Sequence, residues 1–343
     1  MKQYKLTSFW RQASMTLLFA TLSTVVTAQN PNFHIYLAFG GSNMEGQGNI
    51  ESQDKTKYDN FKVLWSSTNF GIYNETRQTG EWYTAVAPLA HKDAKLSVAD
   101  YFGRTLIGKL DEQITVGIIN VSVASASIAL FDKYNYQTYI NSRTEDYFKN
   151  RVDAYGGNPY GRLIEMAQKA KKVGVIKGII MHQGEADMDD SDWPNKVKAV
   201  YNNIISDLNL GNDIPLLAGE VYRDGLAANA NKNIAKLPQQ SSNFYVVSSE
   251  GFTQTLGDGQ NLHFTTQEYR DFGKRYADKM IDVLGDKLSP VSTEITTGVN
   301  QVQGTEDTAP ATFYTIDGLQ QTAPLPGIVI VKKSGNTKKV LMK

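Results

Sequence analysis

The sequence predicts an α/β protein in which helices cover both faces of a parallel sheet. Apolar runs of strand length alternate along the chain with segments that have a helical period. A continuous apolar run is typical of a strand buried on both faces, and the alternation of strands with helices is the pattern of parallel sheets. We therefore expect a five-stranded sheet with strands at 34–39, 115–123, 175–182, 214–220 and 243–248.

The helices between these strands are predicted at 98–110, 160–173, 194–208 and 267–284. The last has apolar residues at three- or four-residue steps, which gives one buried stripe: Tyr269, Phe272, Tyr276, Met280 and Leu284. Two long segments rich in aromatic residues, 49–95 and 131–160, fit the alternation less well. Such segments either stack against sugars at the ligand end of a sheet or cover the core.

The first 28 residues are predicted to be a signal peptide. A basic start with Lys2, Lys5 and Arg11 is followed by the apolar stretch MTLLFATLSTVV, and small residues then precede Gln29, the expected first mature residue. The stretch is too short and too rich in Thr and Ser for a membrane span. We expect export to the periplasm, the cell surface or the medium, with the main domain at 29–288.

The last part of the chain, 289–343, is predicted to be a linker followed by a small β-rich tail. Its composition changes to Thr, Gln, Gly and Pro, and the final stretch GIVIVKKSGNTKKVLMK has the pattern of a hairpin. The tail resembles the C-terminal sorting segments of proteins exported by the type IX secretion route. The alternative interpretation is a structural hairpin that extends the main domain.

Composition excludes several classes of function. Lys plus Arg equals Asp plus Glu, at 35 each, so there is no basic excess to bind nucleic acid. The chain has no cysteine, which excludes a Cys nucleophile and Cys-based metal sites. It also has no H-E-x-x-H pattern, and we expect neither a metal nor a cofactor.

A single serine, Ser42, lies at the end of the first predicted strand, in HIYLAFGGSNMEGQG. The phosphate-binding patterns do not fit this stretch, and the nucleophile elbow G-x-S-x-G fails because residue 44 is methionine. A serine nucleophile needs a base. Of the four histidines, His263 lies in the loop before the last helix, where it can meet Ser42 at the carboxyl edge of the sheet. His182 is expected to be a hydrogen-bonded residue at a strand end.

Five stretches together resemble the ordered blocks of the SGNH (GDSL-like) hydrolases, and more closely carbohydrate esterase family six, which comprises acetylxylan esterases and sialate O-acetylesterase-like proteins. They are FHIYLAFGGSNMEGQG, VGIINVSVASASIALFDK, IKGIIMHQGEAD, PLLAGEV and LHFTTQEYRDFGKRYA, within about residues 33–285. The resemblance implies a flavodoxin-like three-layer α/β/α domain and hydrolysis of esters without a metal.

By this resemblance Ser42 is the nucleophile and His263 the base. The acid is usually an aspartate three residues before the histidine, where this chain has Gln260, or the glutamate of the HQGE block. We expect Glu185 to orient His263, with Asp258 as the second candidate. The backbone N–H groups of Ser42 and Ser125 and the side-chain amide of Gln183 are the expected oxyanion donors.

Four further positions bear on this site. Asn43 is assigned to the oxyanion and substrate residues together with Ser42, Ser125 and Gln183. It is also expected to hold the loop that carries Ser42 in place through hydrogen bonds to the backbone. The chain departs from the family pattern at Gly41, where glutamine is usual, and at Ala124 and Ser125, where two glycines are usual. If that backbone needs a positive φ, alanine or serine would be strained there.

The expected function is a secreted serine esterase that removes acetyl groups from plant polysaccharide, with acetylated xylan as substrate. One alternative is a sialate O-acetylesterase, which would need a cationic pocket, with Arg223 as a candidate. Another is a degenerate member of the family that only binds glycans. It is suggested by Ala124 and Ser125, which replace the two usual glycines, and by the aspartate, which lies at 258 and not at 260. The substrate is an acetylated carbohydrate, and the sequence does not determine the oligomeric state.

Overall fold

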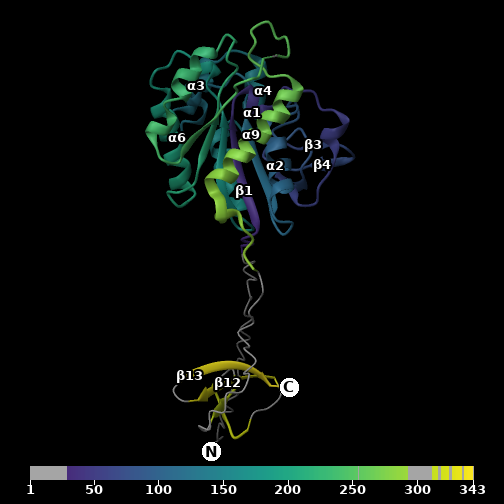
Figure 1. Ribbon diagram of the computed structural model, residues 1–343, viewed down its shortest axis with the longest axis vertical. Helices are drawn as coiled ribbons and strands as arrows, with labels where there is room; N and C mark the ends of the chain where they lie inside the picture. Colours follow the sequence, from purple (N-terminus) through teal and green to yellow (C-terminus); the bar gives the residue numbers. More distant parts are fainter. Residues whose placement is uncertain are drawn as a thin grey trace, which may run out of the picture. The chain divides into compact units, whose positions relative to one another are not determined.

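The structure is a computed structural model that describes residues 29–253, 255–292, 311–315, 318–323, 327–333 and 336–342. Two compact units make up the chain, Met1–Pro290 and Val291–Lys343. The predicted signal peptide lies outside the described residues, as does most of the predicted linker. The first unit is a three-layer α/β/α domain, as expected, with helices on both faces of a central sheet (Figure 1).

The central sheet has seven strands in the order β5-β2-β6-β1-β7-β8-β9. All five predicted strands are present: β1 (Phe33–Gly40), β6 (Thr115–Ser122), β7 (Val175–His182), β8 (Leu216–Gly219) and β9 (Phe244–Val247). Two further strands, β2 (Phe61–Leu64) and β5 (Trp82–Thr84), come from the segment 49–95. Every pairing in the sheet is parallel except that of β5 with β2. The sheet is therefore larger than the five strands expected.

Four long helices cover this sheet: α2 (Val98–Lys109), α5 (Pro159–Ala170), α6 (Trp193–Asp207) and α9 (Thr266–Leu284). The shorter helices are α1 (Ser42–Glu45), α3 (Tyr136–Ser142), α4 (Asp146–Asp153), α7 (Asn231–Ile234) and α8 (Leu237–Gln240). Single 3₁₀ turns lie at η1 (Ser52–Lys55), η2 (Ile128–Phe131), η3 (Glu185–Asp187), η4 (Ala228–Ala230) and η5 (Gly285–Leu288). A hairpin of β3 (Phe70–Ile72) and β4 (Glu75–Arg77) lies apart from the main sheet.

Alternation along β1 divides the core into two halves. Ile35, Leu37 and Phe39 pack into a cluster that includes residues of α5 and α6. Tyr36 and Ala38 point the other way, into a cluster with α2 and α9. Successive side chains of a strand point to opposite faces, so a strand between two helical layers must be apolar at every position. This double burial explains why β1 reads as one continuous apolar run.

The carboxyl end of β1 meets its neighbours closely. Gly40 is in register with Ser122 of β6 and with His182 of β7. A Cβ atom on Gly40 would lie 2.1 Å from the carbonyl oxygen of His182, and the φ of Gly40 is +154°. Only glycine fits this position, and it lets the chain turn into α1 with Ser42 at its start. The three strand ends therefore converge around Ser42.

The second unit is a four-stranded sheet in the order β11-β10-β12-β13. The predicted hairpin is confirmed: β12 (Gly327–Lys333) pairs antiparallel with β13 (Asn336–Met342). Two short strands that were not predicted, β10 (Thr312–Tyr314) and β11 (Gln320–Gln321), extend it. The tail is thus a small sheet with pairings of its own.

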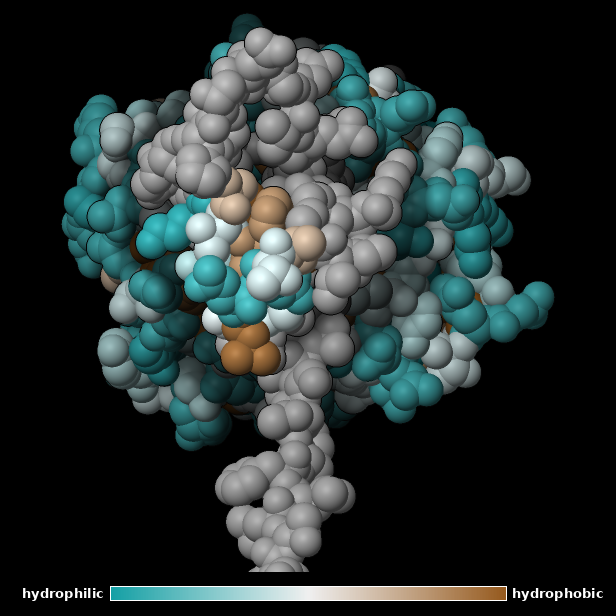
Figure 2. Space-filling view, turned by 90° about the horizontal axis from the view of Figure 1, so that it is seen from below, coloured by the Kyte–Doolittle hydropathy of each residue, from teal (hydrophilic) through white to brown (hydrophobic). Residues whose placement is uncertain are grey.

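Hydrophilic residues predominate over most of the coloured surface of the first unit in the view of Figure 2. Across the part of the chain that the structure describes, no helix is both long and apolar enough to cross a membrane. The apolar side chains are instead concentrated in the two clusters on either face of the sheet.

Candidate active site

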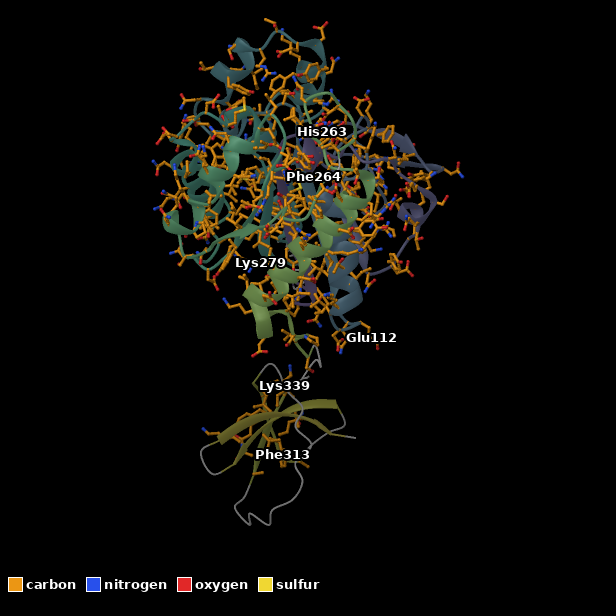
Figure 3. All side chains as sticks on the ribbon, turned by 45° about the horizontal axis from the view of Figure 1, so that its top comes forward. Glu112, His263, Phe264, Lys279, Phe313 and Lys339 are labelled. Carbon is orange, nitrogen blue, oxygen red and sulfur yellow. The ribbon has the colours of Figure 1, made fainter. Side chains whose placement is uncertain are left out.

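Ser42 and His263 come together at the carboxyl edge of the sheet. Ser42 begins α1 directly after β1, and His263 lies in the loop before α9. Ser42 Oγ is 2.8 Å from His263 Nε2, which is a hydrogen-bond distance. His263 lies at the end of the domain opposite Glu112, which lies three residues before the start of β6 (Figure 3). The predicted nucleophile and base are therefore in direct contact.

Asp258 is the carboxylate that faces His263. Its Oδ2 lies 2.7 Å from His263 Nδ1 and also accepts the backbone N–H of His263 at 3.1 Å. Partial burial would raise the pKa of this carboxyl, but backbone N–H groups, led by that of Gln260, and the charge of His263 lower it overall. A carboxylate at Nδ1 fixes the tautomer in which Nε2 accepts the Ser42 hydroxyl proton.

Glu185 has a different partner, which corrects the preference for Glu185 over Asp258. Its Oε1 accepts a hydrogen bond of 2.6 Å from Asn43 Nδ2 and lies 3.6 Å from Nε2 of the buried His182. Glu185 begins η3, three residues beyond the end of β7, so the strand end places it next to Asn43. His263 Nδ1 is already occupied by Asp258.

Asn43 holds the Ser42 loop in place and has no free amide hydrogen for a substrate. Its Nδ2 donates to Glu185 and, at 3.0 Å, to the carbonyl oxygen of Leu262, while its Oδ1 accepts the hydroxyl of Tyr269 at 2.5 Å. These bonds tie α1 to the loop that carries His263. The expected pinning role fits these contacts, whereas a role as an oxyanion donor does not.

Gln183 also differs from the expectation. Its side chain is buried, and Nε2 donates both to the carbonyl oxygen of Ala126, at 3.1 Å, and to the carboxylate of Asp187. Its Oε1 accepts the indole N–H of Trp193. Both amide hydrogens are used within the protein, so Gln183 supports the turn at Ala126 and does not offer a third oxyanion donor.

Two backbone N–H groups remain as oxyanion donors, those of Ser42 and Ser125. Both residues line the same pocket, and neither N–H bonds to an acceptor among the described residues. Ser125 has a φ of +61°. It is the third residue of a turn closed by the bond from Ala126 N–H to Val123 C=O, the position where a type II turn needs a positive φ. A side chain there costs about 1–2 kcal/mol.

The other two departures from the family pattern cause no strain. Ala124 does not have a positive φ. Gly41 has a φ of −90°, and a Cβ atom there would meet nothing closer than Glu185 Oε2 at 3.7 Å. The replacement of glutamine by Gly41 therefore leaves open space beside Glu185 at the pocket wall.

Glu45 is a buried residue of the site that the sequence did not reveal. Its carboxylate accepts the backbone N–H of Ala124 at 2.6 Å and the guanidinium of Arg151 at 3.0 Å, and it lies 3.0 Å from His91 Nε2. The backbone N–H of Asp93 donates to His91 Nδ1 at 3.2 Å, which holds the ring beside Glu45. Because these partners come from three distant segments, no local motif could have identified the cluster.

The pocket over Ser42 has a volume of about 310 Å³. The ionisable residues of its lining include Arg151, Glu185 and His263. Arg223, the candidate cation from the sequence, does not line it: its side chain is 40% exposed and is paired with Glu220. Among the described residues, no three His, Asp or Glu side chains are grouped closely enough to hold a metal ion.

Solved structures share this fold. A protein from Arabidopsis thaliana is 18% identical, with a TM-score of 0.56 over 74% of this chain and 98% of its own. NanS is 14% identical, with a TM-score of 0.52 over 74% and 98%. A structure titled a novel carbohydrate acetylesterase from Xanthomonas citri is 16% identical, with a TM-score of 0.52 over 88% of this chain and 62% of its own. At these identities the likeness concerns the fold.

The family follows from the sequence match. Residues 32–282, which include Ser42, Asp258 and His263, match the SASA family model, described as carbohydrate esterase, sialic acid-specific acetylesterase. The expectation of an SGNH-like carbohydrate esterase is thereby confirmed at the level of the family and the enzyme class. The chain belongs to the SASA family of carbohydrate esterases, and it is an acetylesterase.

Proposed function

We propose that this enzyme is an exported serine esterase that removes O-acetyl groups from a neutral plant polysaccharide, with acetylated xylan as the substrate. The observation that carries the mechanism is the chain of contacts from Ser42 Oγ to His263 Nε2, at 2.8 Å, and from His263 Nδ1 to Asp258, at 2.7 Å. This is the arrangement that a serine needs to become a nucleophile.

In the first half of the reaction, His263 Nε2 takes the proton of Ser42 while Oγ attacks the acetyl carbonyl carbon. The carbonyl oxygen becomes an oxyanion that the N–H groups of Ser42 and Ser125 stabilise. The carbon–oxygen bond to the sugar then breaks, and His263 protonates the departing sugar oxygen. Asp258 stays ionised and stabilises the imidazolium through Nδ1.

In the second half, water attacks the acetyl group on Ser42. His263 takes a proton from this water, and a second oxyanion forms in the same place. The bond to Oγ breaks, Oγ regains its proton from His263, and acetic acid leaves and ionises to acetate in solution. Only two backbone donors support each oxyanion, so turnover is expected to be slower than with three, by about 10²–10³-fold for one missing donor.

The charges of the pocket favour a neutral sugar. Its one Arg, Arg151, is bound to the buried carboxylate of Glu45, and Glu185 adds a second acid with a side chain 13% exposed. An anionic substrate would meet an unfavourable potential beside Glu185. A neutral sugar has hydroxyl groups that can donate to this carboxylate.

A sialate O-acetylesterase is the second candidate, and one observation favours it. Arg151 lines the pocket with its Nε on Glu45 and its Nη1 on the carbonyl oxygen of Tyr147, which leaves Nη2 to bind a carboxylate. The alternative of a non-catalytic glycan-binding protein is dropped, because the family match indicates an esterase and the serine, histidine and aspartate are in contact.

The test compares substrates on the purified protein. Acetate release is measured from acetylated xylan, from 9-O-acetylated sialic acid and from 4-nitrophenyl acetate, with wild type and Ser42→Ala. We expect kcat/KM to be highest for xylan, and Ser42→Ala to lower it on the order of 10⁴-fold or more. A higher kcat/KM for acetylated sialic acid than for acetylated xylan would mean that sialate is the substrate. Full activity of Ser42→Ala would refute the mechanism.

Export remains part of this proposal. It rests on the predicted signal peptide at 1–28 and on the resemblance of the tail to sorting segments of the type IX route. The second unit pairs its own strands into a separate sheet, which is compatible with a separable tail. Detection of the mature enzyme, beginning at Gln29, in a cell-surface or culture fraction of the native host would test it.

A further inference from the structure

The turn that carries Ser125 is under strain and must be held by its surroundings. Ser125 has a φ of +61°, which is unfavourable for serine. The free energy of the turn would therefore fall if the peptide between Ala124 and Ser125 rotated, because this rotation converts the turn to a type that needs no positive φ. The same rotation would point the N–H of Ser125 away from the pocket. An oxyanion donor would then be lost without any change in the rest of the fold.

Three side chains from the segment 131–160 bind Ser125 directly. Arg143 Nη1 donates to its carbonyl oxygen at 3.0 Å, and the hydroxyl of Tyr139 donates to the same oxygen at 3.3 Å. The hydroxyl of Tyr147 bonds to Ser125 Oγ at 3.0 Å. Together these contacts fix the direction of the carbonyl group and of the side chain, which leaves the backbone at Ser125 little freedom to rotate.

The guanidinium of Arg143 is itself held rigidly. Its Nε and Nη2 bind the two oxygens of Glu145 at 3.0 and 2.7 Å. The guanidinium carbon lies 4.4 Å from the centre of the Phe148 ring, a stacking geometry that arginine favours. Nη1 also donates to Tyr139 Oη at 2.7 Å, and that oxygen accepts the N–H of Ser127. Arg143 is thus pre-oriented toward the turn.

We propose that Arg143, assisted by Tyr139 and Tyr147, is a positioning residue for the oxyanion hole: it holds Ser125 in its left-handed conformation so that its N–H faces the reacting carbonyl. This inference rests on the proposed mechanism, in which Ser125 N–H is one of two donors. A glycine at this position would adopt a positive φ without support, whereas Ser125 needs these contacts from outside the turn. The segment 131–160 therefore has a role besides covering the core or stacking against sugars.

The test measures Arg143→Ala in two backgrounds, wild type and Ser125→Gly, with a soluble acetyl ester as substrate. Arg162→Ala is the matched control, because its side chain is also 18% exposed, pairs with a glutamate and donates to a backbone carbonyl, that of Ser66, at 2.8 Å. Arg162 does not line the pocket. Both arginine variants therefore lose similar contacts, but only one loses contact with Ser125.

We expect Arg143→Ala to lower kcat about tenfold or more, up to the 10²–10³-fold of a lost donor, with KM changed less than about threefold. Arg162→Ala should leave kcat unchanged. In the Ser125→Gly background, whatever the rate of that enzyme, Arg143→Ala should change kcat less than about threefold, because glycine needs no support at a positive φ.

An unchanged kcat of Arg143→Ala, or an equal fall in both backgrounds, would overturn the proposal. If Arg143→Ala does not fold, Tyr139→Phe gives the same comparison, since it removes the second donor to the Ser125 carbonyl; again the fall must depend on the residue at 125. The proposed mechanism fails separately, if Ser42→Ala retains activity. Loss of activity in Ser42→Ala with no effect at Arg143 would refute this inference alone.

Discussion

Two of the three histidine–carboxylate pairs among the described residues, those of His263 with Asp258 and of His182 with Glu185, differ in what surrounds them. In the pair of His263 and Asp258, the atoms are 2.7 Å apart, and each side chain is 21% exposed. In the pair of His182 and Glu185, they are 3.6 Å apart, and His182 is fully buried. The first pair contacts Ser42, whereas the second contacts Asn43 and the core.

The same two residue types therefore have different roles. The first pair faces the proposed nucleophile, whereas the second pair supports the fold around it. Burial lowers the pKa of His182, which outweighs the opposite effect of Glu185, so His182 stays neutral inside the domain. A neutral buried ring packed against Phe264 and Phe272 suits a structural role. His263 is open to the pocket and can exchange protons with a substrate.

The largest expected effect separates the two carboxylates. Asp258→Asn should lower kcat about 10²–10⁴-fold, because an amide at Nδ1 favours the wrong tautomer of His263 and cannot stabilise the imidazolium. The melting temperature should change little, since Asp258 lies in a partly exposed loop. Steady-state kinetics on a soluble acetyl ester measure this; a loss below tenfold would remove Asp258 from the mechanism.

Glu185→Gln should have a smaller effect on rate, within about tenfold, because the amide oxygen can still accept the hydrogen bond of Asn43. The loop that carries Ser42 would lose a charged partner, so the melting temperature should fall more than in Asp258→Asn. A larger loss of kcat for Glu185→Gln than for Asp258→Asn would return the orienting role to Glu185.

The buried histidines should make the fold sensitive to acid. Burial and the charge of Lys177 lower the pKa of His34 from 6.5 to about 4, and burial also lowers that of His182. Below 6.5 the unfolded chain takes up protons that the folded state does not, so stability falls as the pH drops toward 4. Urea unfolding at pH 7 and pH 5 measures this loss.

A matched variant sharpens the pH test. His182→Asn cannot take up the proton, so its free energy of unfolding should be lower than that of wild type at pH 7 but should decline less between pH 7 and pH 5. An identical decline in both proteins would mean that His182 is not neutral in the folded state.

The smallest expected effect concerns the second unit. Truncation after Leu288 should leave kcat and the melting temperature of the esterase domain unchanged if the tail is a separable sorting segment. In the native host the same truncation should abolish export. Precipitation or a clear loss of stability would mean that the tail belongs to the fold of the main domain, as a structural hairpin would.

Much of the fold was predictable because doubly buried strands read as continuous apolar runs. The prediction located β1, β6, β7, β8 and β9, but it missed β2 and β5, which are short strands within the aromatic-rich segment 49–95, where no alternation of strands and helices is visible in the sequence. Ser42 and His263 were identified from their places at strand and helix ends. Ser125 was identified from the resemblance, but the side chains that hold it come from a segment whose packing has no periodic signal.

The geometry favours Asp258 over Glu185 as the acid, opposite to the order expected from the sequence, for a physical reason. Asp258 lies five residues before His263, which seemed out of register with the usual spacing of three. The loop contains three residues with positive φ, Gly257, Gly259 and Asn261, which fold it back on itself. The carboxylate of Asp258 therefore reaches the ring of His263 in spite of the longer spacing, and spacing alone could not reveal this.

The central claim is that Ser42 is activated by the pair of His263 and Asp258, and covalent labelling tests it most directly. A fluorophosphonate is incubated with wild type, Asp258→Asn and Glu185→Gln, and the label is located by peptide mass spectrometry. We predict one label per chain, on Ser42, that forms about 10²-fold or more slowly in Asp258→Asn but at nearly the wild-type rate in Glu185→Gln. Labelling of another residue, or equal rates in wild type and Asp258→Asn, would contradict the claim.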